Sequence, residues 1–207
     1  MRCDPVTYDL DVAAIANAVT NRTRAIIIDS PNNPTGKIYP SETRKQLADV
    51  LTEASARNEQ PVYLLSDESY WRIRHDDRPY FSPTGYYPQS FLIYTYGKTL
   101  LTPGQRIGYI ALPPTMPNRE EMRMGLMVSQ LMTGYAFPNA LLQHALPDLE
   151  ELSIDVGHLQ QKRDRMVIAL TAIGYTLHRP EGDGRRGHGT RDLPAVFDIT
   201  ARRYCVA

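Results

Sequence analysis

Three short apolar runs, each followed at once by polar residues, constrain the fold of this chain more than any other feature. The runs lie at 24–29, 62–67 and 91–96, and they lead into an Asn/Pro/Gly turn, an aspartate and a lysine. The first run is β-branched and unbroken, which is typical of a strand buried on both faces. Segments with helical spacing separate the runs, so the sequence predicts an α/β fold. In an open parallel sheet, ligands bind at the carboxyl ends of the strands.

Helices are predicted where apolar residues recur at helical spacing. Asp9 is the predicted N-cap of a first helix over 10–19, and Ser41 that of a second helix with Leu47, Val50, Leu51 and Ala54 as its apolar stripe. Helices are also predicted at 122–131 and 138–146, and one long amphipathic helix over 152–173. A further strand is predicted at 106–112, and 76–88 is predicted to be a surface excursion.

Three motifs occur in a fixed order: SPNNPTG at 30–36, SDESY at 66–70 and YTYGKTLLTPGQRIGY at 94–109. Together they resemble the class I/II aminotransferases, which belong to the pyridoxal-phosphate (PLP) dependent aspartate aminotransferase superfamily. The resemblance runs from about 4 to 182. It implies part of a PLP-binding large domain, with a mostly parallel sheet and helices on both faces. Because members are longer at both ends, we interpret the chain as an internal or C-terminal fragment.

The resemblance implies that Lys98 forms the Schiff base with PLP and then moves protons as a general acid and base. It also implies that Asp67 contacts the pyridine nitrogen of the cofactor, because a carboxylate there keeps that nitrogen protonated. Taken alone, a lysine after a strand is usually a surface residue, and an aspartate there is usually a cap or turn residue. The neighbouring motifs favour the cofactor roles. Glu68 is expected to point away, since successive side chains of an extended segment alternate.

Tyr70 and Asn33 match the residues that hydrogen-bond the 3-hydroxyl of PLP in this family. Thr95 and Arg106 match its phosphate contacts, and arginine can bind a phosphate through two parallel hydrogen bonds. Gly97 stands where many relatives have serine, so one hydroxyl contact is expected to be missing. Tyr70 could instead be a packed aromatic residue, and Asn33 builds a turn in either case.

Composition indicates a globular protein without a strongly charged partner. The formal net charge is zero, so neither nucleic acid nor a membrane surface is an expected partner. No apolar run is long enough to span a bilayer, and no signal peptide is visible. The two cysteines, Cys3 and Cys205, lie near opposite ends, which argues against a disulfide framework and favours a cytoplasmic location. The histidines show no metal-ligand spacing, so no metal is expected.

We divide the chain into a partial large domain at 1–147, a connecting helix with the start of a small domain at 148–182, and an aberrant tail at 183–207. The tail is rich in glycine and arginine and is predicted to be disordered, as a frameshift or truncation would explain. The resemblance implies amino-group transfer between an amino acid and a 2-oxo acid, in a homodimer or with a complementary N-terminal chain. A non-catalytic remnant and a PLP-dependent lyase remain alternatives, and a regulatory protein built on this fold ranks last.

Overall fold

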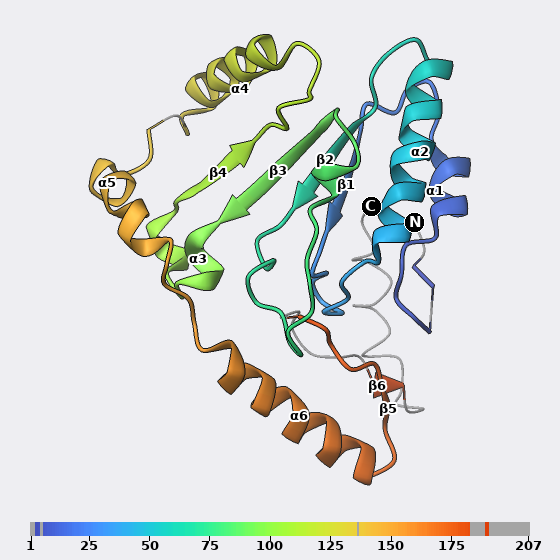
Figure 1. Cartoon of the computed structure of the whole chain (residues 1–207), viewed down its shortest axis with the longest axis vertical. Helices are drawn as coiled ribbons and strands as arrows, with labels where there is room; N and C mark the ends of the chain where they lie inside the picture. Colours follow the sequence, from blue (N-terminus) through green and yellow to red (C-terminus); the bar gives the residue numbers. More distant parts are fainter. Residues whose placement is uncertain (1–2, 5, 136, 183–188, 191–207) are drawn as a thin grey trace.

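The computed structural model describes residues 3–4, 6–135, 137–182 and 189–190, and its centre is a four-stranded open sheet (Figure 1). The strands β1, β2 and β3 run parallel, and β4 pairs antiparallel with β3. They follow one another across the sheet in chain order, as β1 (Ala25–Asp29), β2 (Tyr63–Asp67), β3 (Ser90–Thr95) and β4 (Gly108–Ala111). The predicted α/β fold with a mostly parallel sheet is therefore confirmed.

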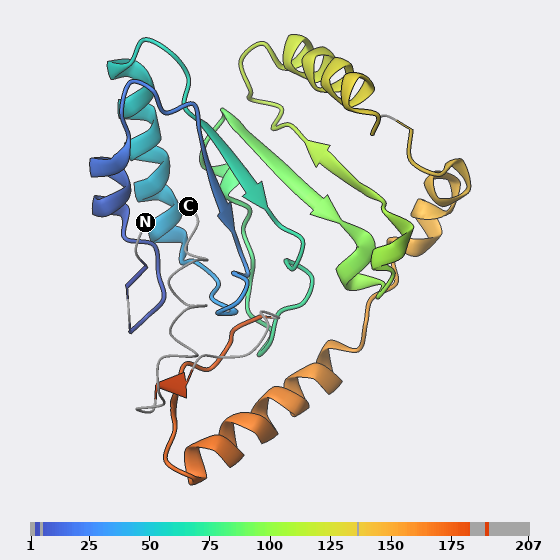
Figure 2. The same cartoon turned by 180° about the vertical axis from the view of Figure 1, so that it is seen from behind.

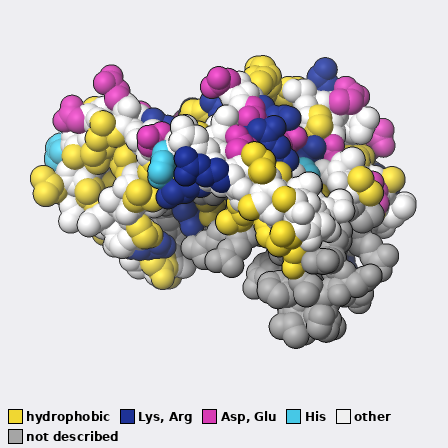
Figure 3. Space-filling view, turned by 90° about the horizontal axis from the view of Figure 1, so that it is seen from below, with side chains coloured by type: hydrophobic (Ala, Val, Ile, Leu, Met, Phe, Trp, Pro, Cys, Tyr) yellow, Lys and Arg dark blue, Asp and Glu magenta, His cyan; other side chains and the backbone are white. Residues whose placement is uncertain are grey.

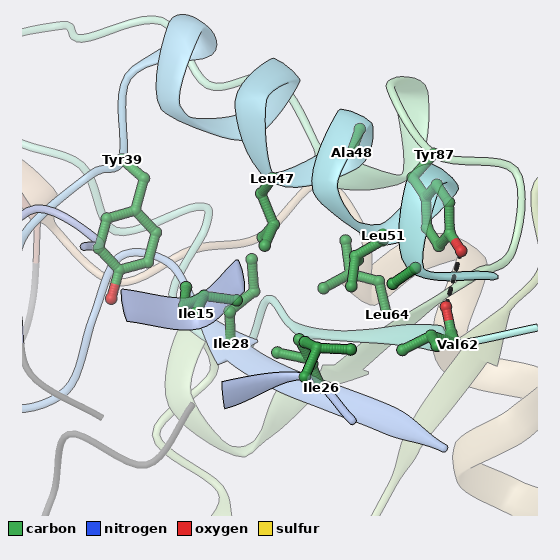
Figure 4. Packing of buried hydrophobic residues seen from close by; sticks show 12 residues of the cluster. Ile15, Ile26, Ile28, Tyr39, Leu47, Ala48, Leu51, Val62, Leu64 and Tyr87 are labelled. Atoms are coloured by element: carbon green, nitrogen blue, oxygen red, sulfur yellow. Dashed lines mark hydrogen bonds between the residues drawn. The ribbon is translucent and has the colours of Figure 1, made fainter. Parts of the chain in front are cut away.

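One face of β1 and β2 is covered by the helices α1 (Val12–Ala18) and α2 (Ser41–Arg57). Leu47 and Leu51 point from α2 toward Ile26 and Ile28 of β1 (Figure 4), and both leucines are 0% exposed. The alternation of strand side chains explains this packing, because every second residue of β1 and β2 faces the helix. At the far end of the cluster, the Tyr87 hydroxyl donates to the Val62 carbonyl over 2.7 Å.

Three local predictions on this side of the sheet are wrong. Asp9 does not cap the first helix: Asp11 does, by accepting from the backbone N–H of Ala14. Ser41 is the first helical residue after Pro40, which has no side chain that could cap the helix. The first strand is buried on only one face, since Ile27 is 47% exposed and the described helices pack on the other side.

Beyond β3 the chain turns through one helical turn, α3 (Tyr96–Thr99), before it enters β4. The helices that follow are α4 (Arg119–Thr133), α5 (Ala140–Leu149) and α6 (Val156–Ala172). Figures 1 and 2 show α4 beyond β4, on the side of the molecule opposite to α1 and α2, with α6 below the sheet. These helices confirm the helical character predicted for 122–173, although the last one begins at Val156 rather than at 152. Among the described helices, none has both the length and the apolar character that a membrane crossing requires.

A buried arginine attaches α6 to the loop that follows β2. The Arg163 guanidinium donates to both carboxylate oxygens of Asp76 over 2.9 Å, to the Pro180 carbonyl over 2.9 Å and to Asp164 over 2.8 Å. Figure 3, which views this end of the molecule, shows acidic and basic side chains lying next to one another. Hydrogen bonds from Arg163 lower the pKa of Asp76. This helix is therefore held largely by directed ionic contacts.

The segment 180–182 lies against the SPNNPTG turn. The backbone N–H groups of Glu181 and Gly182 both donate to the Gly36 carbonyl, over 2.9 and 3.0 Å. A Cβ on Gly36 would lie 2.5 Å from the Cβ of Pro180, and Gly36 also has a φ of +69°. Only glycine fits at this position without displacing the segment 180–182, which follows α6.

The remaining elements are short. A two-stranded antiparallel pair joins β5 (Thr176–Leu177) to β6 (Gly189–Thr190), and the loop at 76–88 contains a 3-10 helix at Pro83–Gly85. That loop is less of a surface excursion than predicted, because Tyr87 is only 3% exposed. Apart from β6, the predicted disordered tail at 183–207 lies outside the described residues.

Candidate functional site

The candidate site lies where β1, β2 and β3 end together. Asp29 pairs in register with Asp67, and Asp67 pairs with Ile93 on β3. Parallel strands that end at one edge bring their following loops together, which is where ligands of such sheets bind. The predicted site residues in SPNNPTG, SDESY and the segment around Lys98 all come from these loops.

The SPNNPTG turn is organised by a carboxylate that the sequence analysis missed. Asp29 accepts a hydrogen bond from Asn32 Nδ2 over 2.6 Å and another from the backbone N–H of Asn33 over 2.8 Å. Burial raises the pKa of Asp29, and the nearby negative charge of Asp67 raises it further. The available signal was an aspartate directly between an apolar run and the turn, at the same strand end as Asp67.

Three of the predicted residues come together from three separate segments. Asn33 Nδ2 lies 3.5 Å from the Tyr70 hydroxyl oxygen, a long hydrogen bond. The Lys98 Nζ atom lies 5.2 Å from the centroid of the Tyr70 ring, within the range of a cation–π contact. Tyr70 is thus the residue that the other two share. An amine, a phenol and an amide therefore converge at the carboxyl edge of the sheet.

Asp67 lies at the same edge, with part of its carboxylate engaged locally. Its Oδ1 accepts from the backbone N–H of Ser69 over 3.0 Å and from the Ser69 hydroxyl over 2.5 Å. Its Oδ2 accepts no hydrogen bond from the described residues. The turn interpretation and the cofactor interpretation are therefore compatible, because one oxygen shapes the turn and the other remains available. Glu68 is 2% exposed and faces the interior, as the alternation predicts.

The two predicted phosphate contacts, Thr95 and Arg106, make hydrogen bonds within their own loops. The Thr95 hydroxyl donates to the Ile107 carbonyl over 3.2 Å, and it caps α3 by accepting from the backbone N–H of Gly97. Arg106 is exposed, has a φ of 52°, and its Nη1 lies 3.4 Å from the Pro103 carbonyl of its own loop. Their role at a phosphate stays a prediction.

Glycines shape the loop that carries Lys98. A Cβ on Gly97 would lie 3.1 Å from Pro103 Cα, so a side chain here would press on the loop that leads back into β4. A Cβ on Gly108 would lie 2.3 Å from the Tyr94 carbonyl oxygen, so glycine at this position lets β4 pack closely against β3. No group of three or more His, Cys, Asp or Glu side chains in the described part of the chain is placed to hold a metal ion.

Residues 1–183 match the family model described as aminotransferase class I and II. The chain belongs to this family. It is 31% identical to the aspartate/prephenate aminotransferase of Thermus thermophilus over 183 residues, which is 83% of this chain and 43% of that protein. It is 30% identical over 191 residues to the alanine aminotransferase of Mycobacterium tuberculosis, covering 87% of this chain and 43% of the relative.

A solved aminotransferase from Eubacterium rectale superposes with a TM-score of 0.85 at 31% identity, covering 87% of this chain and 46% of that one. The fold and the family predicted from the three motifs are therefore confirmed. The chain spans less than half the length of these relatives.

Proposed function

We propose that this chain contributes the cofactor-anchoring part of a PLP-dependent aminotransferase, which transfers an amino group between an amino acid and a 2-oxo acid. The convergence of Lys98, Tyr70 and Asn33 at the carboxyl edge of the sheet carries the proposal. Membership of the aminotransferase family supports it. We further propose the division into a partial large domain at 1–147 and a connecting segment at 148–182.

The residues present at the edge suit PLP. The cofactor has an aldehyde, a phenolic oxygen, a ring nitrogen and a phosphate, and it supplies an electron sink for the substrate's Cα when it is bound. Lys98 offers the amine that an aldehyde requires, and the free Oδ2 of Asp67 offers a carboxylate for a protonated ring nitrogen. Tyr70 and Asn33, which already contact each other, offer a paired donor set for the phenolic oxygen.

Each side chain has a defined role in this proposal. Lys98 would attach the cofactor and then move a proton at the substrate's Cα as a positioned general acid and base. Asp67 holds the proton on the ring nitrogen. Tyr70 and Asn33 would stabilise negative charge on the phenolic oxygen, while Thr95 and Arg106 would bind the phosphate.

Partners are part of the proposal, because the chain covers less than half of its relatives. We propose that a second copy or a complementary N-terminal chain covers the helices beyond β4. On α4, Met124, Met127 and Leu131 are each between 46% and 51% exposed, and Met132 is 82% exposed. An amphipathic helix of this kind gains most of its stability by packing its apolar face. The amino acid and the 2-oxo acid would then bind at an edge that both parts enclose.

Reduction of the cofactor complex tests the proposal. The purified chain is mixed with PLP, reduced with borohydride and digested, and the labelled peptides are mapped by mass spectrometry. We expect an absorbance band in the visible or near-ultraviolet range and the label on Lys98. Lys98→Ala should lose both, whereas Lys162→Ala, which removes an exposed lysine on α6, should keep both. A label spread over other lysines would refute the site.

Substrate reactivity separates the alternatives. Adding aspartate or alanine, the amino acids named for two relatives, to the unreduced PLP complex should remove the absorbance of the aldehyde form, and a 2-oxo acid should restore it. A chain that binds PLP at Lys98 and releases product while the cofactor stays in its aldehyde form, with no need for a 2-oxo acid, would be a lyase. A chain that binds no PLP, even with an added N-terminal half, would be a non-catalytic remnant.

A further inference from the structure

Behind the candidate site, a set of buried groups connects the SPNNPTG turn to the end of β2. The backbone N–H of Ser30 donates to the Asp67 carbonyl over 3.2 Å, and the Ser30 hydroxyl accepts from the backbone N–H of Tyr39 over 3.3 Å. The Tyr39 carbonyl accepts from Arg44 Nε over 2.8 Å and also from Arg44 Nη2. Ser30, Tyr39 and Arg44 are each at most 3% exposed. A path of hydrogen bonds therefore runs from Asp67 to the first turn of α2.

A second path returns from Arg44 to the residue after Asp67. The Arg44 guanidinium carbon lies 5.2 Å from the centroid of the Tyr80 ring. Tyr80 lies near enough to Glu68 that the carboxylate raises the pKa of the phenol, in addition to the larger effect of burial. Glu68 Oε1 also accepts from the Ser82 hydroxyl over 2.5 Å. Glu68 directly follows Asp67 in the chain, so these groups lead back to the start of the first path, with an electrostatic rather than a hydrogen-bonded link between Tyr80 and Glu68.

This circuit, called the buried ring below, consists of Asp67, Ser30, Tyr39, Arg44, Tyr80 and Glu68. Burying a carboxylate or a guanidinium is costly unless other groups compensate it. No ion pair joins Arg44 to Glu68 among the described residues. The Glu68 carboxylate accepts from Ser82, and Arg44 donates to the Tyr39 carbonyl and lies over the Tyr80 ring, while Arg44 Nη1 has no hydrogen-bond partner among the described residues. Apolar side chains of similar volume would cost less free energy to bury. The charged groups are therefore better explained by the fixed geometry that their directional contacts impose.

Of the members of the buried ring, only Asp67 is also a predicted cofactor contact. Its other members act on the two segments that present the site: Ser30 opens the turn that carries Asn33, and Glu68 lies between Asp67 and Tyr70. The backbone N–H of Glu68 also donates to the Ile93 carbonyl over 2.8 Å, which ties the same residue to β3. A shift of either segment would separate Asn33 from Tyr70, whose contact is already long at 3.5 Å.

We propose that Glu68 and Arg44 are positioning residues, which act through the buried ring to hold Asp67 and the SPNNPTG turn at a fixed separation. The benefit to cofactor binding rests on the proposed function. The coupling between Asp67 and the SPNNPTG turn does not require cofactor. Loss of the Glu68 carboxylate or of the Arg44 guanidinium should therefore loosen a segment distant in sequence, and not only the neighbourhood of the substituted residue.

Hydrogen–deuterium exchange of the full chain without cofactor measures this coupling. Glu68→Gln removes the negative charge near Tyr80, and Arg44→Met leaves the Tyr39 carbonyl without its donors. In both variants, peptides covering 30–39 and 66–72 should exchange faster by about tenfold. Tyr87→Phe is the matched control, because it also removes a buried polar contact beside α2 yet lies outside the ring. It should speed exchange around 55–64 and leave 30–39 unchanged.

Three results would overturn the proposal. Faster exchange at 66–72 alone in Glu68→Gln would make Glu68 a local group, and a uniform rise along the whole chain would make the ring an ordinary part of the core. Unchanged exchange in both peptides would remove the coupling itself. Should Glu68→Gln not fold, Ser82→Ala removes only the hydroxyl that Glu68 accepts from and should give the same pattern with a smaller rise.

A PLP titration then links the ring to the site. The ring variants should bind PLP several-fold more weakly than the unsubstituted chain, while Tyr87→Phe binds as the unsubstituted chain does. If the unsubstituted chain does not bind PLP, the proposed function is contradicted. The coupling through the buried ring is then tested by the hydrogen–deuterium exchange alone. Normal PLP affinity in variants with loosened segments would show that the ring positions nothing that the cofactor uses.

Discussion

Leu51 on α2 is 0% exposed, whereas Met132 on α4 is 82% exposed, although both residues lie on long helices that follow a strand. On the α2 side, the chain supplies its own cover: β1, β2, α1 and the loop before β3 enclose one continuous apolar cluster. We define the apolar arm as α4 together with Tyr135, Phe137 and Leu141. No side chain of α4 is buried, and the three other residues are 78–87% exposed. The same amphipathic pattern therefore predicts a helix in both places and does not say what the helix packs against.

The largest effect is expected inside the packed side. Leu51→Ala leaves a cavity beneath α2, and such substitutions cost about 2–5 kcal/mol of the free energy of unfolding. Urea denaturation followed by circular dichroism should show the midpoint falling sharply. If Leu51→Ala and Leu131→Ala on the apolar arm had similar effects, the contrast between the two regions would be wrong.

A smaller loss is expected at the boundary between the core and the candidate site. Asp29→Ala leaves Asn32 Nδ2 and the Asn33 backbone N–H without their acceptor, which typically costs about 1–3 kcal/mol. Thermal unfolding gives the stability, and borohydride labelling gives the occupancy of Lys98 by PLP. We expect both to fall, since the turn that holds Asn33 depends on this carboxylate. Asp49→Ala, on the exposed face of α2, should change neither.

The attachment of α6 should respond to pH. Because Arg163 lowers the pKa of Asp76 in the folded chain, the contact stabilises the protein above the unfolded carboxyl pKa of about 3.9. That contribution is lost as the pH falls through the lower pKa of the folded state. Asp76 is partly exposed, so the loss should stay below about 1 kcal/mol. The unfolding midpoint measured from pH 6 to pH 3 should fall less in Asp76→Asn than in the unsubstituted chain, and parallel curves would contradict this account.

The smallest effect on stability is expected on the apolar arm. Met132→Gln and Leu131→Gln replace exposed apolar side chains and should change the free energy of unfolding of the isolated chain by less than about 0.5 kcal/mol. They should nevertheless reduce self-association, which analytical ultracentrifugation measures directly, because they remove apolar surface that another chain would cover. Unchanged association would place the contact surface elsewhere.

Periodicity and motif order were enough to predict the four strands of the main sheet, most helices and the family. These features depend on local burial, and β1, β2 and β3 each keep their apolar run within a residue or two of the predicted bounds. Caps were harder: Asp9 and Asp11 are equally suitable by type, and only the path of the chain decides between them. In the structure, Asp9 instead accepts from the hydroxyl of Thr43 on α2, a contact between residues far apart in sequence.

The candidate site was predicted by residue type but not by geometry. Asn33, Tyr70 and Lys98 lie together, whereas the Arg106 guanidinium lies 3.4 Å from the Pro103 carbonyl of its own loop. Asp29 was missed because a strand-ending aspartate has no motif of its own. The role of Glu68 could not be foreseen either, since Arg44 and Tyr80 reach it only through folding.

Gly36 shows how a requirement at one position can originate far away in the chain. The reason that no side chain is tolerated there is Pro180, whose Cβ would lie 2.5 Å from any Cβ added at position 36. A survey of all substitutions should therefore find position 36 intolerant whether or not cofactor binding is selected. Variants shortened before position 180 should accept alanine at 36 more readily, apart from the cost of its φ of +69°. The requirement for glycine at position 36 would then arise from the packing of a distant segment as much as from the chemistry of the turn.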